Sequence, residues 1–378
     1  MRVFTECNDA AFWADPAAGF ARLFAADERV LRAPDGALCL FGQAELAAFA
    51  RHPDIEGVVI DKEAFGEHTD LAALYAAGLF AQAGAPHRVL RRAALAGLGV
   101  APIASHAAQI DALVTRALAD CPADTPFDLA EDLVLPLTAR VWAQVAGYPA
   151  GTAAALADAV AILSDTAAEP GAQAAAARRL RALTRETRQA GASPFIRAIA
   201  DALPVGSDPA ALVASMAVDG IDSAAAGLGG ALAVLARQPH DTIERFGIEA
   251  SLQEALRLAM PVILSMRQAT ADVTLAGHSV ERGTILWMWW GAGCADPAAY
   301  PGPERFAPAR AGPRAPVFGA GAHACLGHAL IRASAHPLIR GAFGSTWRLV
   351  TEGPALAAQP WRLARLPRQS VRWSDRPA

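Results

Sequence analysis

The sequence predicts a mainly helical chain with a small β region, and three observations support this fold class. Alanine-rich segments with apolar residues at helical spacing recur through the first two thirds of the chain. Clusters of proline and glycine near residues 122–126, 147–151 and 203–209 separate these segments. Runs typical of strands are few, and most of them lie between residues 262 and 290.

The expected helices follow in order along the chain, each with larger apolar residues three or four positions apart. They cover residues 44–51, 87–98, 103–118, 129–145, 153–163 and 172–188. A further run at 210–236 is apolar throughout, but Asp219 and Asp222 interrupt it. Because charges are costly inside a membrane, we expect a buried central helix there rather than a membrane span.

The expected strands cover residues 30–40, 262–270, 273–275 and 284–290. A last helix at 328–343 is followed by a short β-rich tail. No internal repeat and no linker interrupts the chain, so residues 1–378 are expected to form a single domain. No flavin or iron-sulfur module is expected within it.

Composition narrows the class of protein. The chain is 53% hydrophobic and carries a net charge of -4, which gives no reason to expect binding to nucleic acid or to an anionic membrane. The first residues contain no apolar run of the kind found in signal peptides or anchors. The cysteines are odd in number, widely spread and without a C-x-x-C pair, which disfavours both disulfides and structural zinc: Cys7, Cys39, Cys121, Cys294 and Cys325. A cytoplasmic, reducing environment is expected.

A glycine-rich turn from Phe318 to Gly327 places Cys325 immediately before the helical stretch at 328–343. Free backbone N–H groups and the positive end of the helix dipole should both favour the thiolate there. Gly321 permits a positive φ, Gly327 lets a flat macrocycle approach the backbone, and Phe318 can shield the sulfur from water. We therefore expect Cys325 to be an iron ligand.

This segment resembles the haem-binding signature F-x-x-G-x-x-x-C-x-G of the cytochrome P450 family. Phe318, Gly321, Cys325 and Gly327 match all four fixed positions, and His323 matches the extended bacterial form. The resemblance covers about residues 40 to 350. It implies a cytochrome P450 fold with haem b between the central helix and the helix after the cysteine. Cysteine ligation that favours O–O cleavage is the known arrangement of that family.

Four cationic residues match family positions that bind the haem propionates. His87 and Arg91 lie four apart on one helix, Arg267 follows a later helix, and His323 stands two residues before the cysteine. A buried carboxylate needs such a cationic partner. Each residue alone would more often be a solvated surface group, but together in the family's order they are expected to bind the propionates.

Residues 219–224 resemble the family element [AG]-G-x-[DE]-T-[TS], with departures. The resemblance implies that Gly220 leaves room for O₂ and that Asp222 and Ser223 relay protons as acid and alcohol. Ser223 replaces the usual threonine, so its hydroxyl is held less firmly. That hydroxyl can bond back to the carbonyl of Asp219, four residues earlier.

Asp219 stands where the family has a small apolar residue. Desolvation is expected to raise its pKa. Two interpretations remain open: the carboxylate bonds within the bent helix turn, or it anchors a hydroxyl or amine of the substrate. Other tentative substrate residues are apolar or aromatic: Leu79, Phe80, Val262 and Ile263.

Glu254 and Arg257 resemble the family's E-x-x-R element, which implies a structural role on the cysteine side of the haem. Residues 293–297 depart from the family's N-R-D-P, because the arginine is missing although Asp296 and Pro297 remain. We expect this change to remove one ion pair.

The sequence therefore predicts a haem-thiolate monooxygenase that inserts one atom of O₂ into a small hydrophobic molecule. Electrons are expected from a ferredoxin or flavodoxin with its reductase. Two alternatives remain: a peroxide-driven peroxygenase, against which Asp222 and Ser223 count, and a haem-binding sensor or carrier without turnover.

Overall fold

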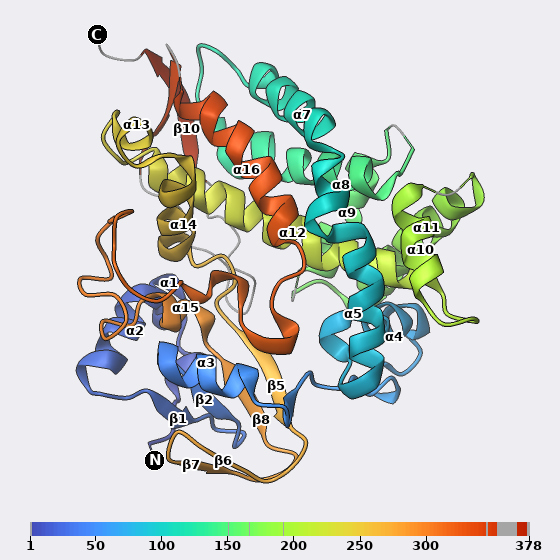
Figure 1. Ribbon diagram of the computed structural model, residues 1–378, viewed down its shortest axis with the longest axis vertical. Helices are drawn as coiled ribbons and strands as arrows, with labels where there is room; N and C mark the ends of the chain where they lie inside the picture. The colour runs from blue at the N-terminus through green and yellow to red at the C-terminus, as the bar shows by residue number, and fades with distance from the viewer. Residues whose placement is uncertain are drawn as a thin grey trace.

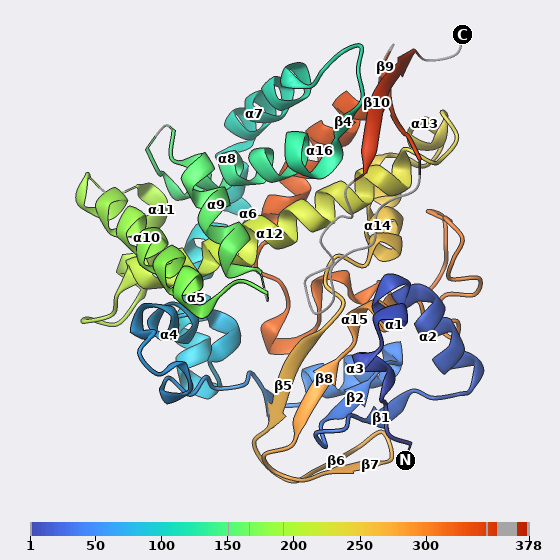
Figure 2. The ribbon, with the colours of Figure 1, turned by 180° about the vertical axis from the view of Figure 1, so that it is seen from behind.

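The computed structural model describes residues 2–149, 151–165, 167–191, 193–344, 347–353 and 369–375. Most helices gather in one part of the molecule, and the main sheet lies beside the N-terminal helices in the other part (Figure 1). The central helix α12 (Pro209–Leu235) runs through the helical part, as the reverse view in Figure 2 shows. The expectation of a mainly helical fold with a small β region is confirmed.

The remaining α-helices of the described residues vary from one turn to more than five turns. They are α1 (Ala10–Ala14), α2 (Pro16–Ala25), α3 (Gln43–Arg51), α4 (Thr69–Ala76), α5 (Gly84–Leu98), α6 (Val100–Ala104), α7 (Ala107–Asp120), α8 (Leu135–Ala146), α9 (Ala153–Leu163), α10 (Pro170–Gln189), α11 (Pro194–Ala202), α13 (Thr242–Phe246), α14 (Ile248–Ala259), α15 (Trp290–Cys294) and α16 (His328–Phe343).

Strands form three small sheets. The largest has the order β1-β2-β8-β5-β3, and β2 pairs with β8 in parallel while its other pairs are antiparallel. Their bounds are β1 (Val30–Arg32), β2 (Leu38–Leu40), β3 (Ile55–Glu56), β5 (Ser265–Ala269) and β8 (Ile285–Met288). The others contain β4 (Phe127–Asp128), β9 (Trp347–Thr351) and β10 (Ser370–Asp375), and β6 (Val273–Leu275) with β7 (His278–Val280).

Other helices surround helix α12, which explains why its side chains are apolar on most sides. Asp208 caps its start by accepting the N–H of Ala210, and Pro209 occupies the first turn. The helix packs against α8, α9, α10 and α14. It is long and apolar enough to cross a membrane, but 67% of its most apolar window is buried inside the molecule. This burial agrees with the expected central core helix.

Several sequence-predicted elements differ in detail. The strand expected at 30–40 is two strands joined at a turn where Gly36 has φ +89°. The helix expected at 103–118 is broken, and the chain bends by 77° between α6 and α7. The helix expected at 129–145 begins as a π-helical turn at Leu129–Val134. Most of the tail beyond residue 353 lies outside the described residues, although β9 and β10 agree with its expected β content.

An aromatic cluster around Trp289 fixes the N-terminal segment, which the sequence left unassigned. Phe4 and Phe12 contact the Trp289 ring edge-on at centroid distances of 5.5 and 5.8 Å, and Phe41 stacks on it at 5.6 Å. Such pairs add to the free energy gained from burying apolar area. The residue after β8 therefore anchors α1 and α2 to the main sheet.

Candidate functional site

The turn that presents Cys325 is shaped by a contact with α3. Gly321 has φ +70°, and a Cβ at this position would lie 1.7 Å from the carbonyl oxygen of Ala50. The N–H of Cys325 donates a hydrogen bond of 2.8 Å to the carbonyl of Phe318, which closes the turn. A Cβ at Gly327 would lie 3.7 Å from the Cys325 sulfur, so its absence keeps one side of the thiol open. These positions agree with the expected roles of both glycines.

All five cysteines lie in the described part of the chain, and only Cys325 is exposed. The other four are buried in the core, and burial raises the pKa of Cys294 to about 12. A buried thiol with such a pKa is inert at neutral pH. Accessibility therefore selects Cys325 as the metal ligand.

The backbone N–H groups at the turn favour the thiolate, as expected, but they do not decide the pKa of Cys325. Burial raises the pKa of Cys325, and this effect outweighs the backbone N–H groups of Gly327 and His328 and the charge of Arg91, which lower it. The N–H donors are present as expected, but they face a sulfur held inside a protein cavity. A coordinated metal ion is needed to deprotonate the thiol fully.

A cavity of about 350 Å³ lies above Cys325 between α5, α12 and the chain at 262–265. Apolar and aromatic side chains form most of its wall, with a few charged and polar groups among them. The residues that line it are Leu79, Phe80, His87, Arg91, Leu98, Trp142, Met216, Asp219, Gly220, Ser223, Ala224, Val262, Leu264, Ser265, His323, Ala324, Cys325, Leu326, Gly327, Leu330 and Ile331. It brings together residues from five distant parts of the sequence.

The four expected propionate ligands lie near one another in this region. The rings of His87 and His323 stack with centroids 3.9 Å apart, and both face the cavity with Arg91. Arg267 on β5 is buried, and its charge acts on both histidines. Desolvation, together with the neighbouring arginines, lowers the pKa of His87 to about 4 and that of His323 to about 3.

No carboxylate of the described residues forms an ion pair with any of these four groups, and Nε2 of His87 is buried without a hydrogen-bond partner. Desolvation lowers the pKa of Arg267 to about 10, which is the sign of a buried cation that lacks an anion. A group with two carboxylates would satisfy them. Haem b, with its two propionates and an iron for the sulfur, fits this set of residues.

Helix α12 contributes Asp219, Gly220 and Ser223 to the wall of the cavity. The Ser223 hydroxyl donates to the carbonyl oxygen of Asp219, as the sequence predicted. Asp222 is buried. A Cβ at Gly220 would lie 3.5 Å from the Trp142 ring, so the indole limits the space that this glycine leaves. The expected role of Gly220, to leave room for O₂, stays a prediction.

Asp219 lines the cavity, where its carboxylate is accessible through the cavity but surrounded by protein. Desolvation raises the pKa of Asp219 to about 7, in the direction that the sequence analysis predicted. Its charge in turn raises the pKa values of Tyr75 and Cys325, although burial is the larger cause for both. Asp219 thus lies within electrostatic reach of the cysteine.

Three of the four tentative apolar substrate residues line the cavity: Leu79, Phe80 and Val262. The prediction that Ile263 contacts the substrate is wrong, because this residue packs with Phe20, Trp289 and their neighbours in the N-terminal core. Successive side chains of an extended chain point to opposite sides, so Val262 and Leu264 face the cavity and Ile263 faces away.

Sequence reasoning missed Trp142 and Met216, which also line the cavity. Both lie in predicted helices, but helical spacing alone does not tell which apolar residue faces a cavity and which faces the core.

Glu254 and Arg257 form a buried brace behind the cysteine turn. Nε and Nη2 of Arg257 donate to the two carboxylate oxygens of Glu254 at 2.9 and 2.8 Å. Nη1 of Arg257 donates to the carbonyl of Cys294 at 2.8 Å, and Glu254 accepts the N–H of Ala307 at 3.0 Å. The pair therefore ties α14 to residues 294–307, as its expected structural role requires.

Asp296 keeps an ion pair despite the missing arginine at 293–297. Nη1 of Arg29 lies 3.0 Å from each carboxylate oxygen of Asp296, which is buried and also accepts the N–H of Gln43. The expected loss of an ion pair is therefore offset by an arginine from the N-terminal segment.

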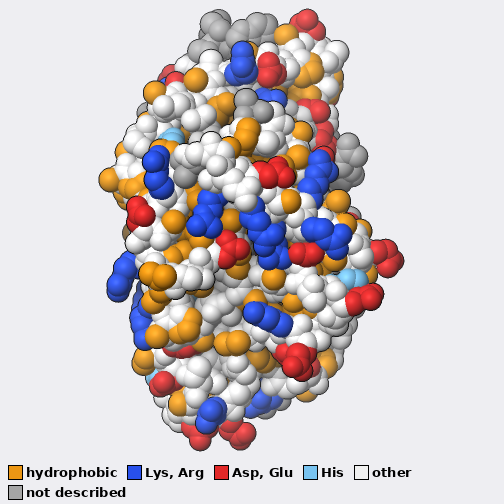
Figure 3. Space-filling model, turned by 90° about the vertical axis from the view of Figure 1, so that its right-hand side faces the viewer, with side chains coloured by type: hydrophobic (Ala, Val, Ile, Leu, Met, Phe, Trp, Pro, Cys, Tyr) orange, Lys and Arg blue, Asp and Glu red, His pale blue; other side chains and the backbone are white. Residues whose placement is uncertain are grey.

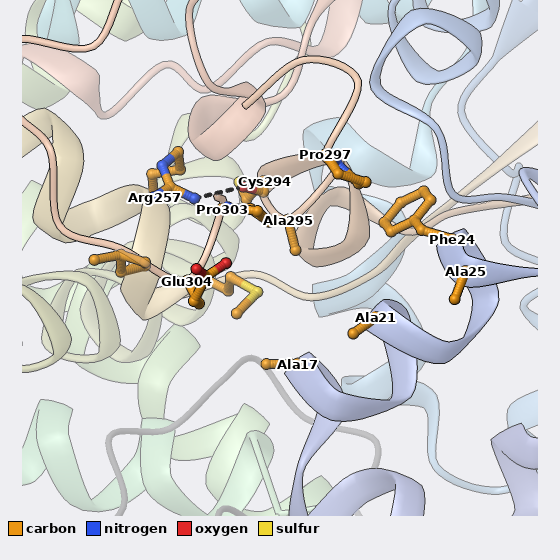
Figure 4. A pocket seen from close by; sticks show the side chains of 12 residues that line it. Ala17, Ala21, Phe24, Ala25, Arg257, Cys294, Ala295, Pro297, Pro303 and Glu304 are labelled. Atoms are coloured by element: carbon orange, nitrogen blue, oxygen red, sulfur yellow. Dashed lines mark hydrogen bonds between the residues drawn. The ribbon is translucent and has the colours of Figure 1, made fainter. Parts of the chain in front are cut away.

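A larger cavity, of about 520 Å³, lies between α2 and residues 294–304 (Figure 4). Ala17, Ala21 and Phe24 face it from one side, and the side chains around Cys294 face it from the other. Arg257 is its most polar buried group, and that side chain is already paired with Glu254. The thiol that lines this cavity, Cys294, has a pKa raised to about 12 by burial, so we place the chemistry at Cys325.

Comparison with known proteins agrees with this site. A family model described as "Cytochrome P450" matches residues 248–335, which include Glu254, Arg257, Arg267 and Cys325. Cytochrome P450 CYP199A2 of Rhodopseudomonas palustris is 33% identical over 126 residues, 32% of this chain and 30% of that protein. Cytochrome P450 NovI of Streptomyces niveus is 30% identical over 94 residues, 25% of this chain and 23% of that protein. The chain spans about a quarter to a third of the length of the curated relatives it matches.

Solved structures show the fold over nearly the whole chain. The crystal structure of CalO2 superposes with a TM-score of 0.85 at 21% identity, covering 99% of this chain and 100% of that one. P450BioI, solved in complex with hexadec-9Z-enoic acid ligated acyl carrier protein, gives 0.84 at 18% identity, covering 96% and 100%.

The fold is that of solved cytochrome P450 structures, and the segment that contains Cys325 matches the cytochrome P450 family model. The residues around Cys325 fit the haem b that members of that family bind.

Proposed function

We propose that this protein is a monooxygenase that inserts one atom of O₂ into a small organic molecule held in the cavity above Cys325. The observation that carries the proposal is one accessible thiol near two arginines and two histidines that lack a carboxylate partner among the described residues, in a cavity that Ser223 also lines. Bound haem would supply an iron at which O₂ is activated.

The protein's own residues have separate tasks in this proposal. Cys325 holds the iron, while His87, Arg91, Arg267 and His323 neutralise the propionates and fix the plane of the group. Leu79 and Phe80 keep water away from an apolar substrate.

Proton delivery is assigned to α12. Ser223 lines the cavity and has a hydroxyl that can donate to a bound oxygen once it leaves the Asp219 carbonyl. Asp222, buried next to it in the sequence, is proposed to resupply that proton. A peroxygenase needs no such relay, which is why we favour O₂ as the oxidant.

We propose a cytoplasmic location and a separate electron donor of the ferredoxin or flavodoxin kind. Arg88 and Arg92 are exposed on α5, the helix that also carries His87 and Arg91. Basic side chains, with acidic ones among them, lie across the middle of the face in Figure 3. Arg332, just after the cysteine, was also expected from the sequence to belong to such a docking patch, but it is paired with Glu249 at 2.9 Å. A basic patch would attract an acidic donor.

The first test compares Cys325→Ser with Cys294→Ser in protein reconstituted with haem. Cys325→Ser should abolish the absorption band of the reduced carbon monoxide complex that is typical of thiolate ligation, and Cys294→Ser should keep it. The reverse result would mean that the wrong cysteine has been assigned.

The second test measures substrate consumption with a reductase, a ferredoxin and NAD(P)H, or with peroxide alone. Turnover with the electron donor supports the monooxygenase. Turnover with peroxide only would replace it by a peroxygenase, and no turnover with any ligand that perturbs the haem spectrum would indicate a sensor or carrier.

A further inference from the structure

The carboxylate of Asp219 has no assigned role in the proposed reaction. The residue lies on α12 one turn before Ser223 and lines the cavity. Its backbone carbonyl accepts the Ser223 hydroxyl, but its side chain forms no hydrogen bond or ion pair with any residue that the structure describes. The local interpretation, in which the carboxylate bonds within its own helix turn, therefore has no contact to support it.

The charges of the cavity do not supply a partner either. Arg91 and Arg267 are the two arginines of this region, and neither forms an ion pair with Asp219. Two haem propionates match two arginines. If each propionate pairs with one arginine, the Asp219 carboxylate has no positive charge left to pair with.

Burial is the only cause of the raised pKa of Asp219, so no neighbouring cation of the described residues stabilises its ionised form. An ionised carboxylate in a largely apolar cavity is costly unless a ligand brings the opposite charge.

We propose that Asp219 is a specificity-determining residue and that the substrate of this enzyme carries a cationic amine on an apolar body. The inference rests on the proposed function and names the substrate class for the same cavity. An ammonium group would complete the charge balance and pair with the carboxylate where solvent is partly excluded.

The surroundings of Asp219 suit the rest of such a molecule. Met216, one turn earlier on α12, lines the same wall, and Trp142 faces it from α8. Phe80 lines the cavity and lies edge-to-face with Tyr75 at a centroid distance of 6.3 Å. Aromatic rings near a carboxylate add cation–π attraction for an ammonium group and apolar area for its body.

Asp219 would also choose the position that is oxidised. Asp219 and Cys325 line the same cavity and lie within electrostatic reach of each other. Fixing the ammonium at Asp219 therefore fixes the distance along the molecule to the carbon that faces the cysteine side. Regiochemistry should depend on this one carboxylate.

The test uses a pair of probes with the same shape and different charge. A phenylalkyl trimethylammonium ion carries a fixed positive charge and has no free lone pair for the iron, and its tert-butyl isostere is neutral. Dissociation constants are measured by calorimetry on the haem-loaded wild type and on Asp219→Asn. The matched control is Asp70→Asn, which changes a carboxylate on α4 that pairs with Arg178 and Arg181 outside the cavity.

The wild type and Asp70→Asn should bind the ammonium probe about tenfold or more tightly than the isostere, as expected for a partly desolvated charge pair. Asp219→Asn should lose this preference while binding the isostere unchanged. Equal affinities of the wild type for the two probes would overturn the inference, and this arm needs no variant to fold.

The results can distinguish a failure of this inference from a failure of the proposed function. If Cys325 ligates the haem and electron-driven turnover occurs, but charge makes no difference to binding, only the substrate class is wrong. If Cys325→Ser leaves the thiolate band intact, the proposed function fails whatever the two probes do.

Discussion

Replacing Gly321 by alanine tests whether the cysteine turn is held by its contact with α3. The new Cβ would lie 1.7 Å from the Ala50 carbonyl oxygen, so the turn or the end of α3 must move by more than an ångström. The positive φ of +70° costs a non-glycine residue about 1–2 kcal/mol, and forced repacking adds about 1–3 kcal/mol. We expect a loss of about 2–5 kcal/mol in the free energy of unfolding.

Gly283→Ala is the matched control. Gly283 has φ +89° but no atom within 4 Å of its missing Cβ, so only the conformational cost of about 1–2 kcal/mol applies. The change in the entropy of the unfolded chain is the same for both variants and cancels. Urea unfolding of the metal-free proteins measures the two losses. Equal losses would show that the turn does not press on α3 and would refute the reasoning.

Three further predictions follow from single side chains. Glu254→Gln should lower the free energy of unfolding by about 3–5 kcal/mol, because it leaves a buried arginine unpaired, while Glu304→Gln on the exposed loop should change it by less than about 1 kcal/mol. Burial tends to raise the pKa of Glu254, but its hydrogen bonds and ion pairs with arginine lower it overall. The wild type should therefore be more stable than Glu254→Gln above the ordinary pKa of a glutamate, and this difference should shrink as pH falls through the lowered pKa. A difference in the free energy of unfolding that stays constant in urea titrations at decreasing pH would contradict this. Because desolvation raises the pKa of Asp219 from 3.8 to about 7, the stability of the metal-free wild type relative to Asp219→Asn should fall as pH rises between these values; melting temperatures with identical pH dependence would argue against it. Ser223→Ala should keep substrate affinity and divert electrons into hydrogen peroxide, measured as peroxide formed per NAD(P)H, and Asp222→Asn should slow turnover roughly 10²-fold; unchanged coupling in both would remove α12 from proton delivery.

The local motifs could be predicted from the sequence because each depends on residues close together in the chain. The turn from Phe318 to Gly327, the i, i+4 pair His87 and Arg91, and the i, i+3 pair Glu254 and Arg257 have their geometry set by one turn or one helix. The long apolar run at 210–236 likewise predicted its own burial, since no exposed helix is apolar on all sides.

Sequence patterns could not supply what distant segments decide. Arg29 replaces the missing arginine beside Asp296 across 267 positions of the chain. The extended chain after α14 turns Val262 towards the cavity and Ile263 away from it. Trp142 narrows the space at Gly220 because α8 happens to pack there. The spacing of apolar residues in the sequence shows which face of a helix or strand is buried, but it does not show which other element packs against that face.

By itself, the sequence predicted the family resemblance and the residues proposed to meet the haem, because iron ligation, propionate binding and the brace each require particular side chains at fixed local spacing. Only the tertiary structure decided which thiol is accessible, that burial outweighs the helix end at Cys325, and that Asp219 lacks a partner among the described residues. Solvent exposure and electrostatic balance are sums over everything that surrounds a group, and those surroundings come from all parts of the chain.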